Sequence, residues 1–380
     1  MSGVLAPGSR IGLMGGGQLG RMFILAARSM GYRVSVFVPE DSSPAGQVAD
    51  EETTRDYLDE EAVRAFARSV DVLTFEFENI PQQALQWASE YGEVRPRGEI
   101  LHTTQNRARE KEFLAAAGFP LPAWANVATA EDLAAAARLT GYPAILKTAS
   151  FGYDGKGQQR LESDKDARQC DLSGGPFVLE AKVPFAMEVS VIVARGSDGQ
   201  MVCYPVCENM HRNHILDTTV VPARVSPDVA GRAEQLARAV AAQLHLVGVL
   251  AVEMFLLPDG TLLINELAPR PHNSGHFSID ACVTSQFEQQ VRAVCQWPLG
   301  SPELLRPCAM ANLLGDLWAE GEPNWAAATA LGEVKIHLYG KAEPRPGRKM
   351  GHLTAFGSSP ETALARVMAA RHALPAGRRN

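Results

Sequence analysis

The sequence predicts a mixed chain, α/β at its start and α+β beyond, that opens with a doubly wound parallel sheet. Short apolar strands alternate with helices over about the first hundred residues, and a glycine turn joins the first strand to the first helix. That pattern breaks at Pro120 and Pro122. The length of 380 residues corresponds to two or three domains at roughly 100–200 residues each. We therefore expect an N-terminal domain over 1–122, a small domain over 123–183 and a larger domain over 184–380.

The amino-acid composition argues against several functional classes of protein. Hydrophobic residues make up 46% of the chain and charged residues 21%, which supplies enough apolar material for packed cores. The formal net charge of −7 argues against a protein that coats nucleic acid or an anionic membrane. No apolar run approaches the roughly 18–20 residues of a membrane span, and the N-terminus lacks the features of a signal peptide. The six cysteines form no C-x-x-C motif, so we expect reduced thiols and a cytoplasmic protein.

The N-terminal elements follow from apolar runs and from the residues that end them. Gly31 and Pro39 are placed to end a helix and a strand, and Pro81 opens a later helix. The expected order is a strand at 10–14, a glycine turn at 15–20, a helix at 21–30, a strand at 32–38, a helix at 60–68, a strand at 71–77 and a helix after residue 81. One continuous helix is then expected over 103–117, with Gly118 as its end.

Beyond Pro122 the elements are less regular, and a glycine loop interrupts them. The expected order is a helix at 131–140, a strand at 143–148, the loop at 151–158, a strand at 177–183, a strand at 188–194, an alanine-rich helix at 230–246 and a hairpin over 250–264. No internal repeat or low-complexity tract is visible, so a repeat architecture is not expected.

The turn Gly15–Gly20 fits the pattern G-x-G-x-x-G after a strand and before a helix. Such a turn lets backbone N–H groups and a helix N-terminus approach a phosphate, and it is typical of dinucleotide-binding proteins. The acidic residue expected about 20 positions later would be Glu40 or Asp41, which lie in a turn rich in proline and serine rather than at a strand end. A nicotinamide-dependent oxidoreductase is kept as an alternative, because the same turn also serves other phosphate ligands or tight packing.

Two carboxylates, Glu76 and Glu78, end the third of these strands. The carboxyl ends of parallel strands form the ligand crevice of an open sheet. Alternation along the strand would place both side chains on one face. The spacing alone does not separate a ligand site from a solvated strand end.

Lys147 closes an apolar strand, and the glycine loop GYDGKGQ follows at 152–158. Glycines that allow close backbone approach, with a lysine on each side, predict a lid over a triphosphate. The loop is not a P-loop, because G-x-x-x-x-G-K-[ST] is absent. The strand 177–183 further on could offer backbone groups to an adenine edge, with Glu188 near a ribose, although an ordinary strand has the same spacing.

The predicted hairpin around residues 250–264 gives the clearest indication of a binding site. A four-residue turn that pairs Leu257 with Leu262 would put Glu253 opposite Glu266. Two facing carboxylates in otherwise apolar strands repel each other, and a divalent cation between them relieves the conflict. Oxygen ligands suit Mg²⁺ that carries the phosphates of a nucleotide. One protonated or outward-facing glutamate is the simpler alternative, and the neighbouring Asn265 favours the metal.

Two further segments are unusually polar. PRPHNSGH, at 269–276, follows the hairpin directly, and its two histidines are expected to line a site rather than a core loop. Near the end, Tyr339-Gly340-Lys341 and the run 345–349 form a basic turn in an otherwise acidic chain. A phosphate clamp and a solvated charge run are both compatible with this turn.

Taken together, GGGQLGRM, FEFEN, GYDGKGQ, VEMF, NELAPRPHNSGH, YGK and RPGRKMGH resemble the N5-carboxyaminoimidazole ribonucleotide synthetase family, which are ATP-grasp ligases of purine biosynthesis. The resemblance runs from about Ile11 to Phe356, nearly the whole chain, and NELAPRPHNSGH and RPGRKMGH are its most specific motifs. It implies an ATP-grasp fold with an N-terminal α/β domain, a small lid domain and a large C-terminal domain. It also implies a homodimer that uses ATP and Mg²⁺ and has small-molecule partners only.

The resemblance also implies roles for individual residues. ATP would be bound by Arg107, Lys147, Gly152, Tyr153, Asp154, Gly155, Lys156, Gly157, Gln158, Glu180, Ala181, Lys182, Val183, Glu188, His211, Asn265 and Glu266. Magnesium would be bound by Glu253 and Glu266. Aminoimidazole ribonucleotide would contact Glu76, Tyr153, Asp154, Lys156, His272, Lys341 and Arg348. The catalytic set would be Asp154, Lys156, Arg270 and His272, with Asp154 or His272 accepting a proton from the amine.

The implied reaction joins bicarbonate to 5-aminoimidazole ribonucleotide at the expense of ATP, through carboxyphosphate. Other ATP-grasp chemistry is the main alternative, such as formate-dependent glycinamide ribonucleotide transformylation or biotin carboxylation, and the two most specific motifs argue against both. A non-catalytic nucleotide sensor would be expected to lack Lys147, Glu253 or Glu266, and all three are present.

Overall fold

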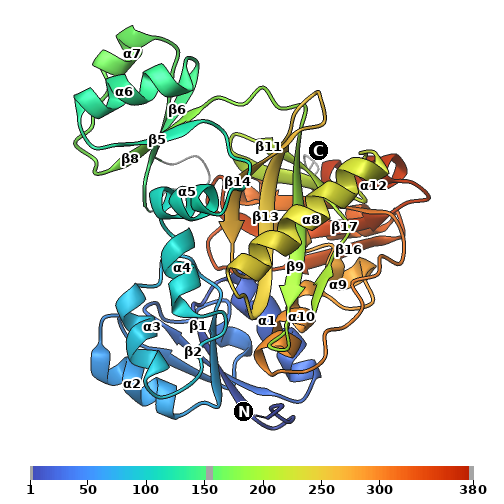
Figure 1. Ribbon diagram of the computed structural model, residues 1–380. Coiled ribbons are helices and arrows are strands. Elements are labelled where there is room, and N and C mark those ends of the chain that lie inside the picture. The colour runs from blue at the N-terminus through green and yellow to red at the C-terminus, as the bar shows by residue number, and fades with distance from the viewer. Residues whose placement is uncertain (1–2, 151–156, 376–380) are drawn as a thin grey trace.

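The computed structural model describes residues 3–150 and 157–375, and within these ranges the strands form three sheets (Figure 1). The first sheet belongs to the N-terminal part, the second to the small part that projects from the rest, and the third to the C-terminal half. Among the described residues no helix is long and apolar enough to cross a membrane.

The N-terminal sheet has the order β3-β2-β1-β4, and every pair in it is parallel. Successive residues face opposite cores: Leu13 packs with one cluster beneath α1, and its neighbour Met14 packs with another beneath α2 and α3. Helices therefore cover both faces, which confirms the doubly wound prediction. The elements are β1 (Arg10–Met14), α1 (Gln18–Ser29), β2 (Arg33–Val38), β3 (Glu51–Thr54), α2 (Glu60–Arg68), β4 (Val72–Phe75) and α3 (Gln82–Ser89).

Three N-terminal predictions need correction. β3 was not expected, because EETT has no apolar alternation and forms a polar edge strand. β4 ends at Phe75 rather than at 77. The single helix over 103–117 is wrong: α4 (Gly98–Thr104) and α5 (Arg107–Ala116) are separate, because the Asn106 side chain accepts a hydrogen bond from the Arg109 N–H and starts a new helix.

The small second part contains an antiparallel sheet of order β5-β8-β6-β7, covered by two helices. Its own apolar cluster includes Val127, Leu133, Leu146 and Leu179, so it packs largely on itself. In Figure 1 it projects away from the rest of the molecule. Its elements are β5 (Trp124–Val127), α6 (Ala130–Thr140), β6 (Ala144–Thr148), β7 (Gln158–Leu161), α7 (Asp164–Arg168) and β8 (Phe177–Ala181).

The C-terminal half is built on a nine-stranded sheet of order β14-β13-β9-β11-β12-β15-β17-β16, with β10 paired to β9. Alternate residues of β9 again face two cores: Val191 packs with α8, and Ile192 packs with Phe277 on the other face. The strands are β9 (Met187–Arg195), β10 (Met201–Cys203), β11 (Cys207–Arg212), β12 (Ile215–Val221), β13 (Gly248–Leu256), β14 (Leu262–Ala268), β15 (Cys308–Leu314), β16 (Val334–Leu338) and β17 (Lys349–Phe356).

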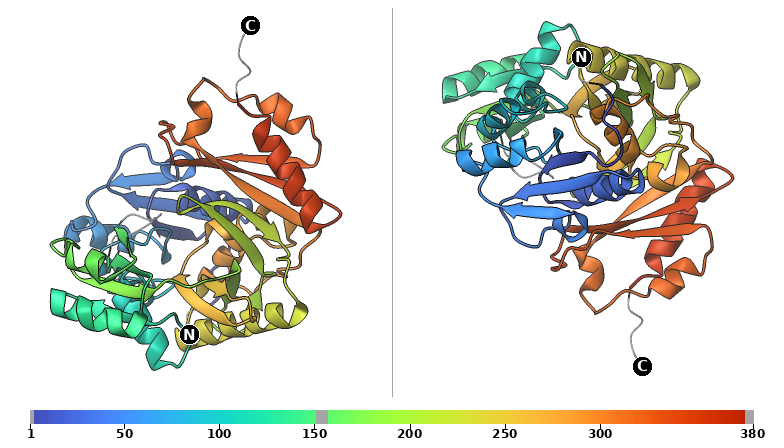
Figure 2. Two further views of the ribbon diagram at one scale, coloured as in Figure 1. Left: turned by 90° about the horizontal axis from the view of Figure 1, so that it is seen from above. Right: turned by 90° about the horizontal axis from the view of Figure 1, so that it is seen from below.

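Helices connect this sheet to the rest of the molecule. α8 (Pro227–Gln243) lies across β9 and β13, and α12 (Pro360–His372) packs on β15 and β17. α10 (Gln286–Val294) lies between the two larger sheets, because Phe287 and Val291 pack in the N-terminal core while the helix also contacts β9 and β13. Figure 2 shows the N-terminal part lying against the C-terminal half, so residues from both can share one site.

The hairpin of β13 and β14 reaches the expected pairing by a different register. Leu256, not Leu257, pairs with Leu262, so the turn is one residue longer than predicted. A bulge at Asn265 then shifts the register back, and Glu253 does pair with Glu266. The predicted turn was wrong and the predicted carboxylate pair is confirmed, because the bulge compensates for the longer turn.

Candidate active site

A buried ionic cluster joins the small sheet to α5. The Glu180 carboxylate on β8 lies 3.1 Å from the Lys147 Nζ on β6 and 3.3 Å from the Lys111 Nζ on α5. Only 3% of the Glu180 side chain is exposed. Burial opposes ionisation of this carboxylate, yet the two lysines hold its pKa below the usual value. Burial also lowers the pKa of Lys147.

The sequence analysis named Arg107 on α5 but missed Glu110 and Lys111 on the same helix. Lys111 lies one helical turn after Arg107, so both fall on one face of α5, and this spacing was the signal that could have identified it. Glu110 is buried and accepts a hydrogen bond of 3.0 Å from the Leu267 N–H on β14. Burial, and then the charge of Glu266, raise the pKa of Glu110 to about 8. Arg107 lies 3.6 Å from Glu266, so the start of α5 is joined to the hairpin.

The carboxylates of Glu253 and Glu266 lie on neighbouring strands and face the same region. Burial and then the charge of Glu266 raise the pKa of Glu253. Among the described residues no three His, Cys, Asp or Glu side chains form a complete metal cage. The pair fits a Mg²⁺ ion whose remaining ligands are phosphate and water oxygens, because hard oxygen donors are present and their charges are incompletely compensated.

A second ion pair lies on the same sheet. The Nδ1 atom of His211 on β11 is 2.6 Å from the Glu188 carboxylate on β9. Burial disfavours the charged imidazolium, but the hydrogen bond to Glu188 and the charge of Glu253 outweigh it and raise the pKa of His211. His211 therefore lies within electrostatic reach of the hairpin carboxylates.

His272 is oriented by a chain of buried hydrogen bonds. Asn209 donates to the Ser190 hydroxyl (2.8 Å), which donates to the Ser274 hydroxyl (2.9 Å), which lies 2.9 Å from the His272 Nδ1. The Ser274 N–H also donates to that Nδ1 atom. Because Nδ1 accepts, the proton of the neutral ring lies on Nε2, 3.4 Å from a Glu253 oxygen. Burial holds the pKa of His272 well below its usual value, so the ring is neutral.

Glu76 and Glu78 do not act as a pair. Because β4 ends before them, alternation along a strand does not govern their directions. The Glu76 carboxylate accepts hydrogen bonds from the N–H groups of Gly17 (2.7 Å) and Gly20 (3.2 Å) in the glycine turn. Glu78 instead forms an ion pair with Arg270. The donors that would meet a dinucleotide phosphate are thus used by a carboxylate of the chain itself.

The basic turn between β16 and β17 packs against the N-terminal domain. The Gln47 amide donates a 2.8 Å hydrogen bond to the Gly340 carbonyl. Lys341 donates to a carbonyl at the start of β17, and Arg348 donates to the Glu343 carbonyl. These bonds hold the two cations in one turn.

Loop 270–276 and the basic turn converge on Glu76. Burial raises the pKa of Glu76, and this rise is opposed by the Gly17 amide, by Arg270 and by Lys341. Two predicted segments that are 70 residues apart in the chain therefore act on one carboxylate of the N-terminal domain.

The described residues of the predicted connector and glycine loop lie in the small sheet or directly beside it. Ala181 ends β8, and the N–H groups of Ala181 and Lys182 donate to main-chain carbonyls, so an adenine edge would have to meet other groups of the connector, such as Val183. Gln158 begins β7, directly after Gly157. The predicted residues Gly152, Tyr153, Asp154, Gly155 and Lys156 lie outside the described residues.

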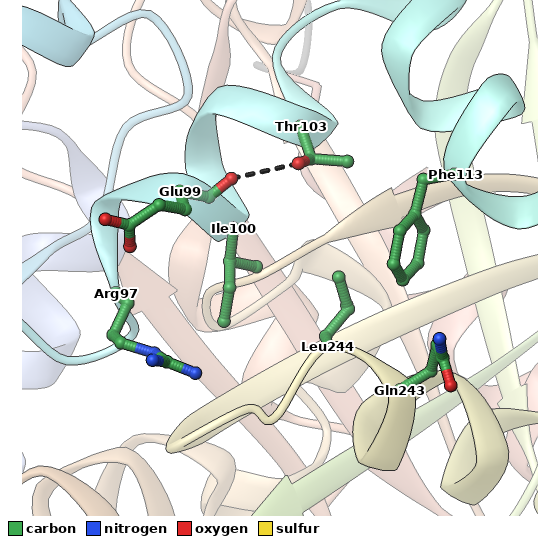
Figure 3. Close-up of a pocket in the computed structure, with 7 residues that line it drawn as sticks. All are labelled: Arg97, Glu99, Ile100, Thr103, Phe113, Gln243 and Leu244. Atoms are coloured by element: carbon green, nitrogen blue, oxygen red, sulfur yellow. Dashed lines mark hydrogen bonds between the residues drawn. The ribbon is translucent and has the colours of Figure 1, made fainter.

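A separate hollow of about 230 Å³ lies between α4, α5 and the end of α8 (Figure 3). None of the predicted site residues lines it. Its lining residues are Arg97, Glu99, Ile100, Thr103, Phe113, Gln243 and Leu244.

Comparison with known proteins identifies the family of this arrangement. Three family models match: the ribonucleotide synthetase preATP-grasp domain over 9–105, the ATP-grasp domain over 112–287 and the phosphoribosylaminoimidazole carboxylase C-terminal domain over 308–366. The chain is 47% identical to the N5-carboxyaminoimidazole ribonucleotide synthase of Bacillus subtilis, with 94% of each chain covered. It is 43% identical to that of Brucella melitensis, with 92% of this chain and 97% of the relative covered.

Solved structures similar to this chain belong to the same family. An N5-carboxyaminoimidazole ribonucleotide synthetase in complex with ADP is 42% identical, with a TM-score of 0.91 over 98% of both chains. The synthase of Aspergillus clavatus, solved with ADP and 5-aminoimidazole ribonucleotide, is 32% identical, with a TM-score of 0.89 over 97% of this chain and 98% of that one. The chain therefore has the ATP-grasp fold and belongs to the N5-carboxyaminoimidazole ribonucleotide synthase family.

Proposed function

We propose that the chain is an ATP-dependent carbon–nitrogen ligase of de novo purine (IMP) biosynthesis. It joins bicarbonate to 5-aminoimidazole ribonucleotide and releases N5-carboxyaminoimidazole ribonucleotide, ADP and phosphate. The observation that carries this proposal is a convergence of two charge environments. The facing pair Glu253 and Glu266 lies near Arg107, and the charges of Arg270 and Lys341 both lower the pKa of Glu76.

The chemistry explains why both environments are needed. Bicarbonate is a poor electrophile, so one of its oxygens attacks the γ-phosphorus of ATP and the bond to ADP breaks. In the resulting carboxyphosphate, the exocyclic amine of the ribonucleotide attacks the carboxyl carbon, the bond to phosphate breaks, and the amine loses a proton. Groups that neutralise the phosphoryl oxygens and exclude water supply most of the catalysis.

Residues on α5, β6, β8 and the hairpin would bind the nucleotide. Lys147 lies in the buried cluster around Glu180, and Arg107 lies beside Glu266, so both cations are held close to the place where a triphosphate would lie. Glu253 and Glu266 would bind Mg²⁺, which when bound neutralises charge on the transferring phosphoryl group.

The proton on the His272 Nε2 changes its proposed role. A ring whose Nδ1 accepts from Ser274 and whose Nε2 carries the proton has no lone pair directed at the amine, so it acts as a donor rather than a base. We therefore assign the base to Asp154. Lys341 and Arg348 would bind the phosphate of the ribonucleotide, because charged donors of this kind match phosphate oxygens.

The decisive test follows labelled bicarbonate into an acid-labile carbamate. Label is expected with ATP, magnesium and 5-aminoimidazole ribonucleotide, and it is not expected with glycinamide ribonucleotide or biotin. ADP release alone is insufficient, because slow ATP hydrolysis without an acceptor would give the same signal. If glycinamide ribonucleotide with formate is the productive pair, the fold and nucleotide site stand and the acceptor assignment fails.

We also propose a homodimer in the cytoplasm. The family resemblance supports the dimer, and the six cysteines, which form no disulfide and are mostly buried, support a reducing compartment. Sedimentation at micromolar concentration tests the proposed dimer, and a single monomeric species would contradict it.

A further inference from the structure

Gln286, at the start of α10, has no exposed surface, and both ends of its side-chain amide bind the main chain of His272. Its Oε1 accepts from the His272 N–H at 2.9 Å, and its Nε2 donates to the His272 carbonyl at 2.7 Å. The amide therefore pairs with His272 much as a neighbouring strand would.

The loop is shaped to admit this amide. A Cβ atom at Gly275 would lie 2.4 Å from the Gln286 Oε1, which no real side chain tolerates. Ser278 closes the arrangement, because its hydroxyl accepts from the Gln286 N–H at 2.9 Å and donates to the Gly275 carbonyl at 2.6 Å. Close approach to Gln286 thus explains the glycine of PRPHNSGH.

The His272 ring is oriented from the other side. Its Nδ1 is held by Ser274, so the main chain and the ring have independent supports. With both in place, Nε2 lies 3.4 Å from a Glu253 oxygen. Loss of either support would leave the ring free to turn away.

α10 is itself anchored by two more buried glutamines. Gln290 accepts from the Val249 N–H on β13 and donates to the Thr74 hydroxyl on β4, which joins the two larger sheets. Gln289 repeats the pairing of Gln286 on a different residue: it accepts from the Gly300 N–H at 2.8 Å and donates to the Gly300 carbonyl at 2.7 Å. Gly300 lies in none of the segments assigned to the site, so Gln289 is a matched control.

We propose that Gln286 is a positioning residue for the carboxylation reaction, acting by holding the main chain of His272 so that its Nε2 atom faces Glu253. The inference rests on the role proposed for His272. In this proposal Gln286 acts through His272, although its Nε2 also lies 3.3 Å from the buried His276 Nδ1.

The test compares Gln286→Glu with Gln289→Glu. Each change keeps the acceptor and replaces the donor by an oxygen that faces a carbonyl, so the two variants should lose similar stability in urea. Gln286→Glu should lower kcat for labelled carbamate formation by about ten- to a hundredfold, because small displacements of a catalytic group have effects of this size. ADP affinity should change less than about twofold. Gln289→Glu should keep kcat within about twofold.

A double-mutant cycle separates this inference from the proposed role of His272. If Gln286 acts through His272, Gln286→Glu should cause no further loss of kcat in a His272→Ala background, whereas independent roles would multiply. Equal kcat losses in the two glutamine variants, or full multiplication in the cycle, would overturn the inference. An unchanged kcat in His272→Ala alone would instead overturn the role of His272. If Gln286→Glu does not fold, the comparison is repeated with Gln286→Met and Gln289→Met. Methionine has a similar volume and removes both hydrogen bonds.

Discussion

The glycine turn and the β13–β14 hairpin both carry a pattern that suggests a ligand, but they differ in how the chain satisfies its own groups. In the turn, the amides of Gly17 and Gly20 are used by Glu76. In the hairpin, Glu253 faces Glu266, and burial with like charge raises the pKa of Glu253. In the glycine turn the polar groups are already hydrogen-bonded to one another. In the hairpin the negative charges are incompletely compensated.

This difference separates a structural motif from a binding one. Backbone donors that already hold a carboxylate have little to gain from a phosphate, so G-x-G-x-x-G here does not indicate a dinucleotide. Two carboxylates that repel each other gain from any cation that joins them. Whether the polar groups of a motif are already hydrogen-bonded within the chain therefore decides what the motif can bind. Five substitutions test this contrast.

The largest effect is expected from Glu266→Gln, which keeps the shape and removes one of the two charges. ATP turnover should fall on the order of a hundredfold or more, because the remaining ligands neutralise the transferring phosphoryl group less well. Asp259→Asn, in the exposed turn of the same hairpin, is the control and should leave turnover unchanged. A folded Glu266→Gln protein with near-normal turnover would show that the pair binds no catalytic metal.

The next largest effect is expected from Lys341→Ala and Arg348→Ala, which test whether the cations near Glu76 serve a ligand rather than the fold. Each contact to a phosphate is worth roughly 1.5–3 kcal/mol, so the KM for the ribonucleotide should rise about ten- to a hundredfold while ADP affinity is unchanged. Arg345→Ala is the matched control, because Arg345 is an exposed cation of the same turn that pairs with Glu343. Weaker ADP binding with a normal ribonucleotide KM would assign the turn to the nucleotide instead.

The third prediction concerns Glu76→Gln, which disrupts the hydrogen bonds between Glu76 and the glycine turn. One of its contacts to the glycine turn would become an N–H facing an N–H, so the free energy of unfolding should fall by about 1–3 kcal/mol in urea titrations. Glu61→Gln, exposed on α2, should have no such effect. The unmodified protein should show no saturable NADH fluorescence change, and saturable NADH binding would contradict our interpretation of the turn.

The smallest effect is expected from Gln47→Ala, which removes the hydrogen bond from the N-terminal domain to the Gly340 carbonyl. One such hydrogen bond is worth about 0.5–1.5 kcal/mol. Its loss should loosen the basic turn and raise the ribonucleotide KM roughly two- to tenfold. Gln83→Ala, exposed on α3, provides the comparison. Identical KM values in the two variants would mean that the domain contact does not position the turn.

Local patterns predicted much of the fold and many of the charged groups. Alternating apolar residues and the glycines and prolines that end elements were enough to place β1, β2 and α2, because these signals act within a few residues. The break at Asn106 was missed, since the run of good helix formers that follows it concealed a cap. The contact of Lys111 was missed because Glu180 is distant in the chain, and that of Gln286 because a side chain makes it and strand pairing does not reveal it.

The sequence by itself determined which chemical groups are present and, through its apolar runs, the hairpin that carries Glu253 and Glu266, whereas the bulge at Asn265 decided that the two glutamates pair. Only the tertiary structure decided how these groups are satisfied. It directed Glu76 into the glycine turn, paired Glu78 with Arg270 and put the proton of His272 on Nε2. The physical reason is that hydrogen bonding and burial depend on contacts between segments far apart in the chain, and no local spacing encodes which donor reaches which acceptor.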